Sequence, residues 1–185
     1  MNLSNRSFVS LIVITLLGSL SFTSAARAAS AEEIDIKVDG ALTEFKQEVT
    51  GGAEFLKKAK GVLVFPSVLK GGFVVGAEYG EGALRVDNKS ISYYNIASAS
   101  LGFQIGAQEY TIVMVFLKED ALKKFQEGKG WEAGVDGSVA IAKWGAGTDI
   151  NTQNFKDPIV GFVFGNKGLM AGVSLEGSKI TKLDR

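Results

Sequence analysis

The residues of this chain best suited to bind a charged ligand form a lysine cluster beside two apolar side chains. The candidate lipid-binding residues are Phe55, Leu56, Lys57, Lys58, Lys60 and Lys70. Each lysine near an anionic membrane contributes about 1 kcal/mol, so the cluster suits an anionic headgroup. The two apolar side chains suit shallow insertion into the membrane interface. A solvated helix end, where cations complement the helix dipole, is the alternative interpretation.

Two further motifs resemble known sites but lack essential parts. Residues 67–70 fit the S-x-x-K pattern of penicillin-recognising enzymes, yet the S-D-N and K-T-G elements of that chemistry are absent. Asp149, Asn151 and Gln153 resemble the start of a calcium loop, but its sixth and twelfth positions are not glycine and glutamate. We interpret the first motif as a turn between strands and the second as part of a long polar loop, residues 145–157, with a looser calcium site in that loop as the alternative.

Cysteine and histidine are both absent from the chain. Their absence excludes Ser-His-Asp and Cys-His catalysis, and it removes ordinary zinc, haem and iron–sulfur ligation. A hydrolase would therefore need carboxylates, such as Glu78, Glu81 or Glu109, that converge in a pocket with perturbed pKa values. No such constellation is visible in the sequence, so we expect no catalytic residues, no metal, no cofactor and no enzymatic activity.

The N-terminal segment, residues 1–28, has the composition of a cleavable signal peptide. Arg6 provides a short positive start, and the run Phe8–Leu20 is apolar and uncharged. Ala26-Arg27-Ala28 then places small residues at the two positions that a signal peptidase reads. A membrane anchor is the alternative, but a spanning helix needs roughly 20 apolar residues. We therefore expect an exported protein, periplasmic or associated with the cell envelope, with one domain at residues 29–185.

Removal of the signal segment changes the charge balance of the chain. The full chain has 20 basic and 20 acidic residues, and Arg6 and Arg27 leave with the segment. The mature chain then has 18 basic and 20 acidic residues. Nucleic-acid binders usually carry a clear basic excess, so nucleic acid is not an expected partner. The remaining length suffices for one domain with a sizeable core.

Helical periodicity marks the start of the mature chain. Apolar residues recur in steps of three and four, at Ile34, Val38, Ala41, Leu42, Phe45 and Val49. This spacing predicts an amphipathic helix that ends at Gly51-Gly52, followed by a short helix over 53–59. Residues 119–127 predict a third helix that stops at Gly128.

From Gly61 onward the pattern is typical of strands. Pro66 closes the first run, and Asp87-Asn88 and the glycine-rich stretch 76–82 indicate turns. The predicted strands are 61–66, 72–79, 82–86, 90–108, 110–117, 131–135, 138–143, 159–164, 169–175 and 178–183. The sequence therefore predicts an α+β fold, in which a mainly antiparallel, barrel-like curved β-sheet carries an N-terminal amphipathic helix and one short helix packed on it.

Glycines recur four residues apart within several of these strands. The pairs and triplets are Gly72, Gly76 and Gly80; Gly102 and Gly106; Gly161 and Gly165; and Gly168 and Gly172. Even spacing places each set on one strand face, and glycine inside a strand marks close approach by another group. We expect a shallow sheet face. Tight curvature or packing of the N-terminal helix would explain it, and a groove for a lipid chain is the functional alternative.

Several ordered blocks resemble the SYLF domain, also called the Ysc84 actin-binding domain. The matching blocks are 60–66, 70–76, 98–108, Ala121-Leu122 with Phe125, 134–140 and 165–175. The resemblance covers roughly Ala41 to Leu183, and it is closest to the exported bacterial members.

The resemblance implies lipid binding without enzymatic activity. Eukaryotic members bind phosphoinositides, partly through an N-terminal amphipathic helix, and some yeast members bind actin; bacterial members are thought to bind phospholipid. Carried over by position, the amphipathic helix would be Ile34–Val49, with the cluster Lys57–Lys60 after it. This chain departs from the eukaryotic pattern because it has no SH3 or FYVE companion. In an exported protein we expect a phospholipid or membrane surface as partner rather than actin, with a protein-interaction or scaffold module of the envelope as the alternative.

Overall fold

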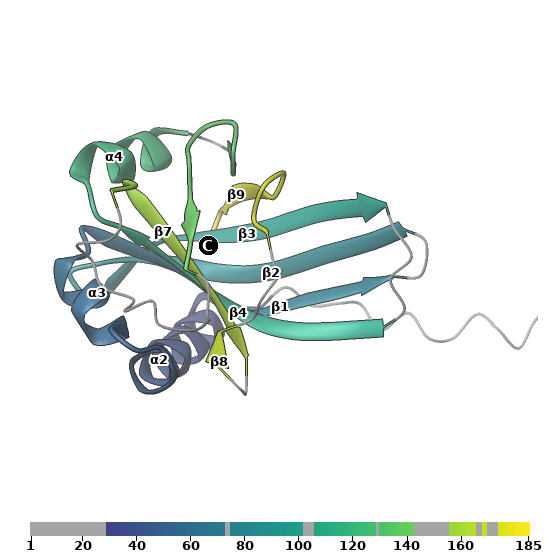
Figure 1. Cartoon of the computed structure of the whole chain (residues 1–185), viewed down its shortest axis with the longest axis horizontal. Helices are drawn as coiled ribbons and strands as arrows, with labels where there is room; N and C mark the ends of the chain where they lie inside the picture. Colours follow the sequence, from purple (N-terminus) through teal and green to yellow (C-terminus); the bar gives the residue numbers. More distant parts are fainter. Residues whose placement is uncertain are drawn as a thin grey trace, which may run out of the picture.

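Four long strands, β1 to β4, form the middle of a curved sheet in this computed structural model (Figure 1). The structure describes residues 29–72, 75–101, 106–128, 130–142, 156–165, 168–169 and 174–185. The helices of this part are α2 (Ala31–Glu48), α3 (Gly52–Lys58) and α4 (Glu119–Glu127). Its strands are β1 (Gly61–Gly72), β2 (Val75–Val86), β3 (Lys89–Leu101), β4 (Gly106–Phe116), β5 (Gly130–Glu132), β6 (Ala140–Ile141), β7 (Ile159–Gly165), β8 (Gly168–Leu169) and β9 (Lys179–Leu183).

The described strands form one sheet in the order β5-β9-β3-β2-β1-β4-β7-β6, with β8 paired to β7. Strand β1 pairs with β2, and β2 with β3, both antiparallel, because short connections favour that arrangement. Strand β4 pairs antiparallel with β1 and does not lie beside β3. The pairing of β6 with β7 is parallel. Figure 1 shows the sheet curling, with β7 crossing the direction of the long strands. The predicted α+β class with a curved, mainly antiparallel sheet is confirmed.

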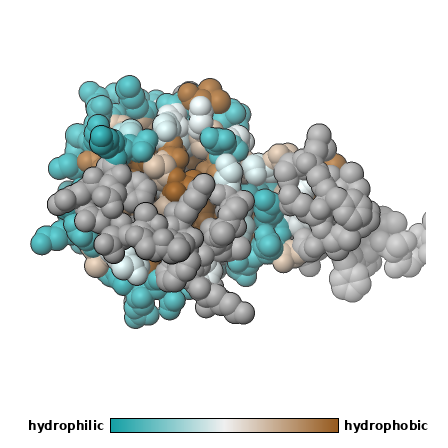
Figure 2. Space-filling view, in the orientation of Figure 1, coloured by the Kyte–Doolittle hydropathy of each residue, from teal (hydrophilic) through white to brown (hydrophobic). Residues whose placement is uncertain are grey.

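Helices cover both faces of this sheet at one end, because alternate strand residues point to opposite sides (Figure 1). Val62 and Val64 of β1 pack with α2 and α3, on what we call the α2 face. Leu63 and Phe65 pack with α4, on what we call the α4 face. Two hydrophobic cores therefore lie on either side of one sheet. Figure 2 shows that hydrophilic side chains dominate the outer surface around the helices.

Helix α2 confirms the predicted amphipathic helix and its inward face. Ser30 accepts a hydrogen bond from the Glu33 backbone N–H at 3.2 Å, and Glu33 accepts one from the Ser30 N–H at 2.7 Å. This capping box satisfies backbone donors that would otherwise have no partner at the helix start. The predicted inward residues that are buried are Ile34, Val38, Ala41, Phe45 and Val49.

Pro66 does not end the first strand, so this prediction is wrong. Strand β1 continues to Gly72 through an irregularity, where the register shifts between Val64 and Ser67 toward β2 and between Phe65 and Val68 toward β4. A bulge leaves one residue out of the ladder, so the missing proline N–H costs no ladder hydrogen bond there. The Pro66 carbonyl instead accepts a hydrogen bond from the Thr111 hydroxyl at 2.9 Å.

Several predicted strand boundaries also differ from the structure. The glycine-rich stretch 76–82 lies inside strand β2 and forms no turn. The predicted strand 90–108 is two strands, β3 and β4, and residues 102–105 between them lie outside the described part. Periodicity alone missed this division, because both strands alternate in the same way. The predicted strands 131–135 and 138–143 are shorter in the structure, and residues 170–173 of the strand predicted at 169–175 lie outside the described residues.

Two local predictions are confirmed. Asp87 and Asn88 both adopt positive φ angles, 49° and 61°, and form the two-residue turn between β2 and β3. Such a turn matches the strand twist, and asparagine and aspartate tolerate its left-handed backbone. Helix α4 occupies the predicted range and buries Leu122 and Phe125. None of the described helices is long and apolar enough to span a membrane.

Glycines near the bulge of β1 face neighbouring backbone at close range. A Cβ atom on Gly82 would lie 1.9 Å from the Val64 carbonyl oxygen, and one on Gly80 would lie 2.9 Å from the Ser67 carbonyl oxygen. These positions therefore admit only glycine, because a side chain would collide with strand β1. Gly80 belongs to the series of glycines four residues apart, and at this position close packing of β2 against β1 explains the missing side chain, in agreement with the tight curvature that the sequence analysis named as one explanation.

Candidate functional site

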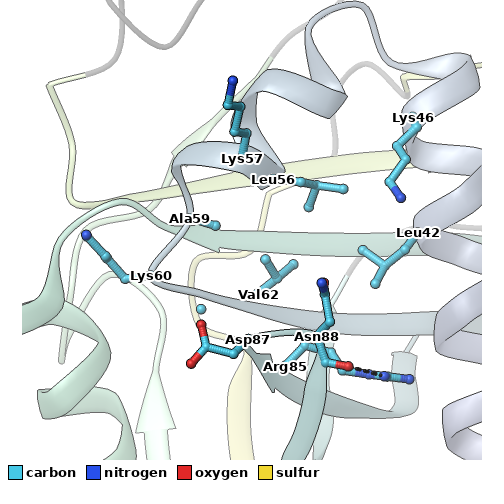
Figure 3. A pocket seen from close by; sticks show the side chains of 11 residues that line it. Leu42, Lys46, Leu56, Lys57, Ala59, Lys60, Val62, Arg85, Asp87 and Asn88 are labelled. Carbon is cyan, nitrogen blue, oxygen red and sulfur yellow. Dashed lines mark hydrogen bonds between the residues drawn. The ribbon is translucent and has the colours of Figure 1, made fainter.

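A pocket of about 340 Å³ lies between the end of α2, helix α3, the start of β1 and the β2–β3 turn (Figure 3). Its lining residues are Leu42, Lys46, Leu56, Lys57, Ala59, Lys60, Gly61, Val62, Arg85, Asp87 and Asn88. We call it the basic pocket, since three lysines contribute to it. It forms because Gly51 has a φ of 80° and redirects the chain from α2 into α3.

The three lysines of the basic pocket come from three different segments. Lys46 belongs to the last turn of α2, Lys57 to α3, and Lys60 to the link before β1. Leu42 and Leu56 are half-buried and add apolar surface to the lining of the same pocket. Three exposed cations around an apolar patch can hold an anion that also carries an apolar part.

The predicted candidate residues divide between this pocket and other places. Leu56, Lys57 and Lys60 line the pocket. Phe55 is fully buried and packs edge-on against Phe162, with ring centroids 4.9 Å apart. It therefore belongs to the core of the α2 face, and no part of it reaches the surface.

The remaining two candidates lie away from the pocket lining. The Lys58 ammonium is 2.8 Å from the Glu54 carboxylate, one helical turn earlier. Lys70 lies nine residues along β1 from Gly61, about 30 Å away at the rise of an extended strand. Its neighbours across the sheet are Glu78 and Gln108. The predicted grouping of Lys70 with the helical lysines does not occur.

Sequence reasoning missed Lys46 and Arg85 as lining residues. Lys46 follows Leu42 by four positions, so both lie on the same side of α2, and this spacing was available in the sequence. Arg85 belongs to strand β2, which is far in the sequence from the helices that line the pocket. No local sequence pattern therefore indicated that Arg85 would lie there. Only the packing of α2 against the β2–β3 hairpin brings it there.

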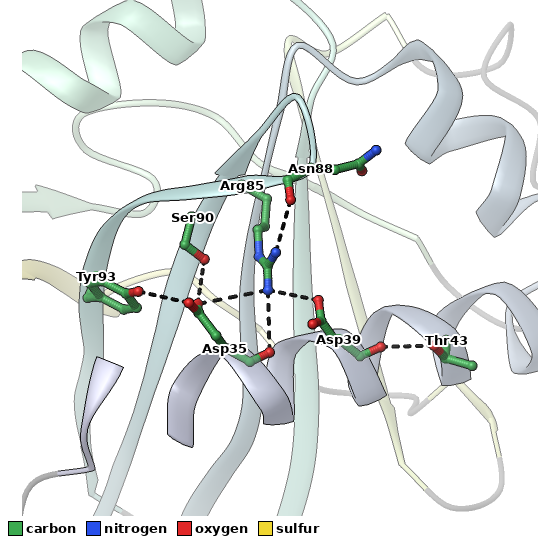
Figure 4. A network of polar contacts seen from close by, with 7 residues as sticks. All are labelled: Asp35, Asp39, Thr43, Arg85, Asn88, Ser90 and Tyr93. Carbon is green, nitrogen blue, oxygen red and sulfur yellow. Dashed lines mark hydrogen bonds and ion pairs between the residues drawn. The ribbon is translucent and has the colours of Figure 1, made fainter. Parts of the chain in front are cut away.

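Arg85 connects α2 to that hairpin through a polar network (Figure 4). Its Nη2 lies 2.8 Å from Asp39 Oδ1 and 3.8 Å from Asp35 Oδ1, and its Nη1 donates to the Asn88 carbonyl at 3.0 Å. Asp35 also accepts hydrogen bonds from Ser90 and Tyr93. Burial, and then the hydrogen bond to Asp35, raise the pKa of Tyr93. Arg85 is engaged by acids, so it shapes the pocket wall while the lysines supply the accessible charge.

A second polar group lies on the α4 face, where Glu78 is 5% exposed. Its Oε2 accepts a hydrogen bond from the Ser98 hydroxyl at 3.3 Å, while Oε1 and the Tyr110 hydroxyl lack hydrogen-bond partners in the described part. Burial and then the neighbouring Glu78 raise the pKa of Tyr110 strongly. The phenol is therefore held in its neutral form.

The carboxylates considered for hydrolysis do not converge. Glu78 projects to the α4 face, whereas Glu81 is paired with Arg185 at 2.8 Å and bonded to Tyr79 on the other face. Glu109 accepts a hydrogen bond from the Ser67 hydroxyl. These three acids therefore form no pair of the kind that general acid–base catalysis requires.

The two remaining motifs have different outcomes. Ser67 and Lys70 lie within strand β1, so the interpretation of this motif as a turn is wrong. Residues three apart in a strand point to opposite faces, so the two side chains do not meet. Asp149, Asn151 and Gln153 lie outside the described residues. Among the residues that the structure describes, no three Asp or Glu side chains gather in a way that could hold a metal ion.

Comparisons with known proteins identify the family. Residues 97–185 match the Ysc84 family model, described as "Las17-binding protein actin regulator". The chain is 34% identical over 131 residues to "SH3 domain-containing YSC84-like protein 1" of Homo sapiens, and 33% identical to that of Rattus norvegicus; each alignment covers 68% of this chain. It is 29% identical over 134 residues to "LAS seventeen-binding protein 3" of Saccharomyces cerevisiae, with 69% of this chain covered.

The aligned region spans only part of these relatives. It covers 38% of the human and rat proteins and 29% of the yeast protein. The family description names Las17 binding and actin regulation, the name of the yeast relative names binding, and none of the printed names gives a catalytic activity. The matched segment includes all of β4, all of α4 and the strands after it, which lie at both edges of the sheet: β4, β7 and β6 beyond β1, and β9 and β5 beyond β3. Residues 97–185 therefore belong to the Ysc84 family, the SYLF domain family that the sequence blocks resemble.

Proposed function

We propose that this chain is a non-catalytic domain that binds anionic phospholipid through the basic pocket. The observation that carries the proposal is that Lys46, Lys57 and Lys60 line the same pocket as the apolar side chains of Leu42 and Leu56. A phospholipid presents the same combination, a charged phosphate beside an apolar chain. Ammonium groups attract the phosphate, and the leucines contact the region where headgroup and acyl chain meet.

We further propose that binding takes place at the cell envelope after removal of residues 1–28. The sequence pattern of these residues supports this proposal, since a positive start, an apolar run and small residues before Ala29 are typical of a signal peptide. An exported domain would meet bacterial phospholipid, whereas actin would be absent from that compartment. The actin regulation named for the family model is therefore not part of this proposal.

Co-sedimentation of the chain beginning at Ala29 with vesicles tests the proposal. We expect binding to vesicles that contain anionic phospholipid, weaker binding to zwitterionic vesicles, and a decline with added salt, because exposed charges are screened within about 10 Å at 0.1 M salt. No binding to either vesicle at low salt would disprove it. Filamentous actin in a parallel assay should not sediment the protein.

Substitution of the pocket lysines locates the binding site. Lys46, Lys57 and Lys60 changed together to alanine should weaken vesicle binding at least tenfold and flatten its salt dependence. The matched control changes the lysines of the α4 region, Lys118, Lys123 and Lys124, which removes the same charge from elsewhere in the fold. Equal losses in both triple variants would indicate a non-specific charge effect and contradict the pocket as the site.

A second candidate function is a protein-interaction module, and one observation favours it. Leu69 and Val75 are each 60% exposed and Tyr79 is 48% exposed, at the end of the sheet that extends beyond the helices (Figure 1). Leu69 and Tyr79 are direct cross-strand neighbours. An exposed apolar group of this kind is typical of contact surfaces. Leu69→Ser with Val75→Ser should abolish a protein contact and leave vesicle binding intact.

A further inference from the structure

Both ends of the described domain meet at one carboxylate, that of Glu81. The Ala29 backbone nitrogen donates to Glu81 Oε2 at 3.3 Å. The Arg185 guanidinium lies 2.8 Å from Oε1, and the Tyr79 hydroxyl donates to the same oxygen at 2.8 Å. The side chains of Glu81 and Arg185 are each 13% exposed. A largely buried anion therefore stands beside the first described residue of the chain.

Ala29 is also the residue that directly follows the predicted signal peptide. Hydrolysis of the Ala28–Ala29 peptide bond by a signal peptidase consumes one water molecule, leaves a carboxylate on Ala28 and frees an amino group on Ala29. At neutral pH this amino group takes up a proton, because its ordinary pKa is about 7.7–8.0. The neutral N–H that faces Glu81 in the precursor is then replaced by an ammonium group with three donors.

We propose that Glu81 is the receptor for the new amino terminus, so that cleavage between Ala28 and Ala29 converts a neutral hydrogen bond into a partly buried ion pair. Hydrogen bonds between charged groups are roughly twice as strong as neutral ones. Arg185 and the Tyr79 hydroxyl both contact Oε1, so the other carboxylate oxygen, Oε2, is the one that faces the Ala29 nitrogen. This inference rests on the predicted signal peptide and is independent of lipid binding.

The ammonium group on Ala29 would lie at the start of helix α2, where it needs a nearby negative charge. Ala29 directly precedes Ser30, the N-cap of α2, and the start of a helix carries partial positive charge. An uncompensated ammonium group at this place would destabilise the helix. The capping side chain of Glu33 is already occupied by the Ser30 N–H. Glu81 is therefore the described carboxylate in contact with the Ala29 nitrogen, and it reaches that nitrogen from strand β2.

Two chains that differ by one residue test the ion pair. One begins at Ala29 and the other at Ala28, so the second carries the same charge about 3.8 Å further along the chain. We expect the chain that begins at Ala29 to melt about 2–4 °C higher, the shift that about 1 kcal/mol produces in a domain of this size. In a Glu81→Gln background the difference should disappear. Comparison within each background keeps the test valid even though the substitution itself lowers the melting temperature.

Glu32→Gln is the matched control, because Glu32 lies in the first turn of α2 and has no contact with the Ala29 nitrogen among the described bonds. In this background the chain that begins at Ala29 should keep its advantage. Equal melting temperatures of the two chains without any other substitution would overturn the proposal. Intact mass of the exported protein provides a second readout, and an amino terminus at any residue other than Ala29 would also overturn it.

Discussion

The guanidinium of Arg85 lies 2.8 Å from the carboxylate of Asp39, and this pair joins helix α2 to the end of strand β2. Asp35, one turn earlier in the same helix, accepts a hydrogen bond from Arg85 through its backbone carbonyl at 3.3 Å. The Arg85 side chain thus contacts two successive turns of α2 and holds the helix against the sheet. The wall of the basic pocket depends on this contact, since Arg85 and Lys46 approach the pocket from the two elements it joins.

Arg85→Gln should therefore lower the free energy of unfolding by about 1–2 kcal/mol, because it leaves Asp35 and the Asn88 carbonyl without a charged donor. Asp39→Asn should cost less than about 1 kcal/mol, since Asp39 is 68% exposed and water screens the pair. Chemical denaturation measures both values. Equal losses in the two variants would contradict the assignment of the anchoring role to the buried Arg85 contacts.

Phe55→Ala and Leu56→Ala should separate stability from ligand binding. Phe55 is fully buried against Phe162, so its truncation should cost about 3–5 kcal/mol. Leu56 lines the basic pocket and is half-buried, so its truncation should cost less stability and weaken vesicle binding. Thermal denaturation and co-sedimentation of both variants measure the two effects. A stable Phe55→Ala protein with impaired vesicle binding would contradict the placement of Phe55 in the core.

Two glycine-to-alanine changes should have opposite effects on stability. A Cβ on Gly82 would lie 1.9 Å from the Val64 carbonyl oxygen, so Gly82→Ala should cost about 3 kcal/mol through strain in the sheet. Gly40 lies inside α2, and a Cβ added there would meet no described atom of another element within 4 Å, so Gly40→Ala should gain about 0.5–1 kcal/mol. Urea titration measures both variants. Loss of stability in Gly40→Ala would contradict the open surroundings of that side of the helix.

Stability should fall at alkaline pH, and Tyr110 should contribute to the fall. Burial raises its pKa in the folded state above the ordinary value of about 10, so the stability it contributes is complete below pH 10 and is lost as pH rises. Tyr110→Phe should flatten this decline. At pH 7 the same change should alter stability by less than about 1 kcal/mol, because the hydroxyl has no hydrogen-bond partner among the described residues. Denaturation at pH 7 and pH 11 measures the difference. An unchanged alkaline slope would contradict the prediction.

Sequence patterns correctly predicted the elements that are determined by residues close together in the chain. The three-and-four spacing from Ile34 to Val49 predicted α2 and its buried face, and Asp87-Asn88 predicted the hairpin turn. The prediction that β1 ends at Pro66 was wrong, because it relied on the general rule that proline interrupts a strand. Its tolerance inside β1 depends on a bulge, which forms only when both neighbouring strands are in place.

The candidate site was only partly predictable, because it too depends on contacts between segments that are distant in the chain. Adjacent positions in the chain revealed Leu56, Lys57 and Lys60, and these residues do line one pocket. The inclusion of Phe55 and Lys70 followed from proximity in sequence, which does not specify burial or the direction of a strand. Arg85 lines the site because α2 packs against β2. This contact joins residues that are far apart in the chain, so no local sequence pattern predicts it.

The sequence by itself determined which reactive groups the protein has: it contains lysines and carboxylates but no cysteine or histidine. It also determined the periodicity that makes the predicted elements amphipathic. Tertiary structure decided which of these groups meet. It placed Lys46 of α2 and Lys60 beside β1 in the lining of one pocket, buried Phe55 against Phe162, and placed Glu81 between Ala29 and Arg185. Periodicity specifies that a face will be buried, whereas the partner of that face depends on contacts between residues distant in the chain.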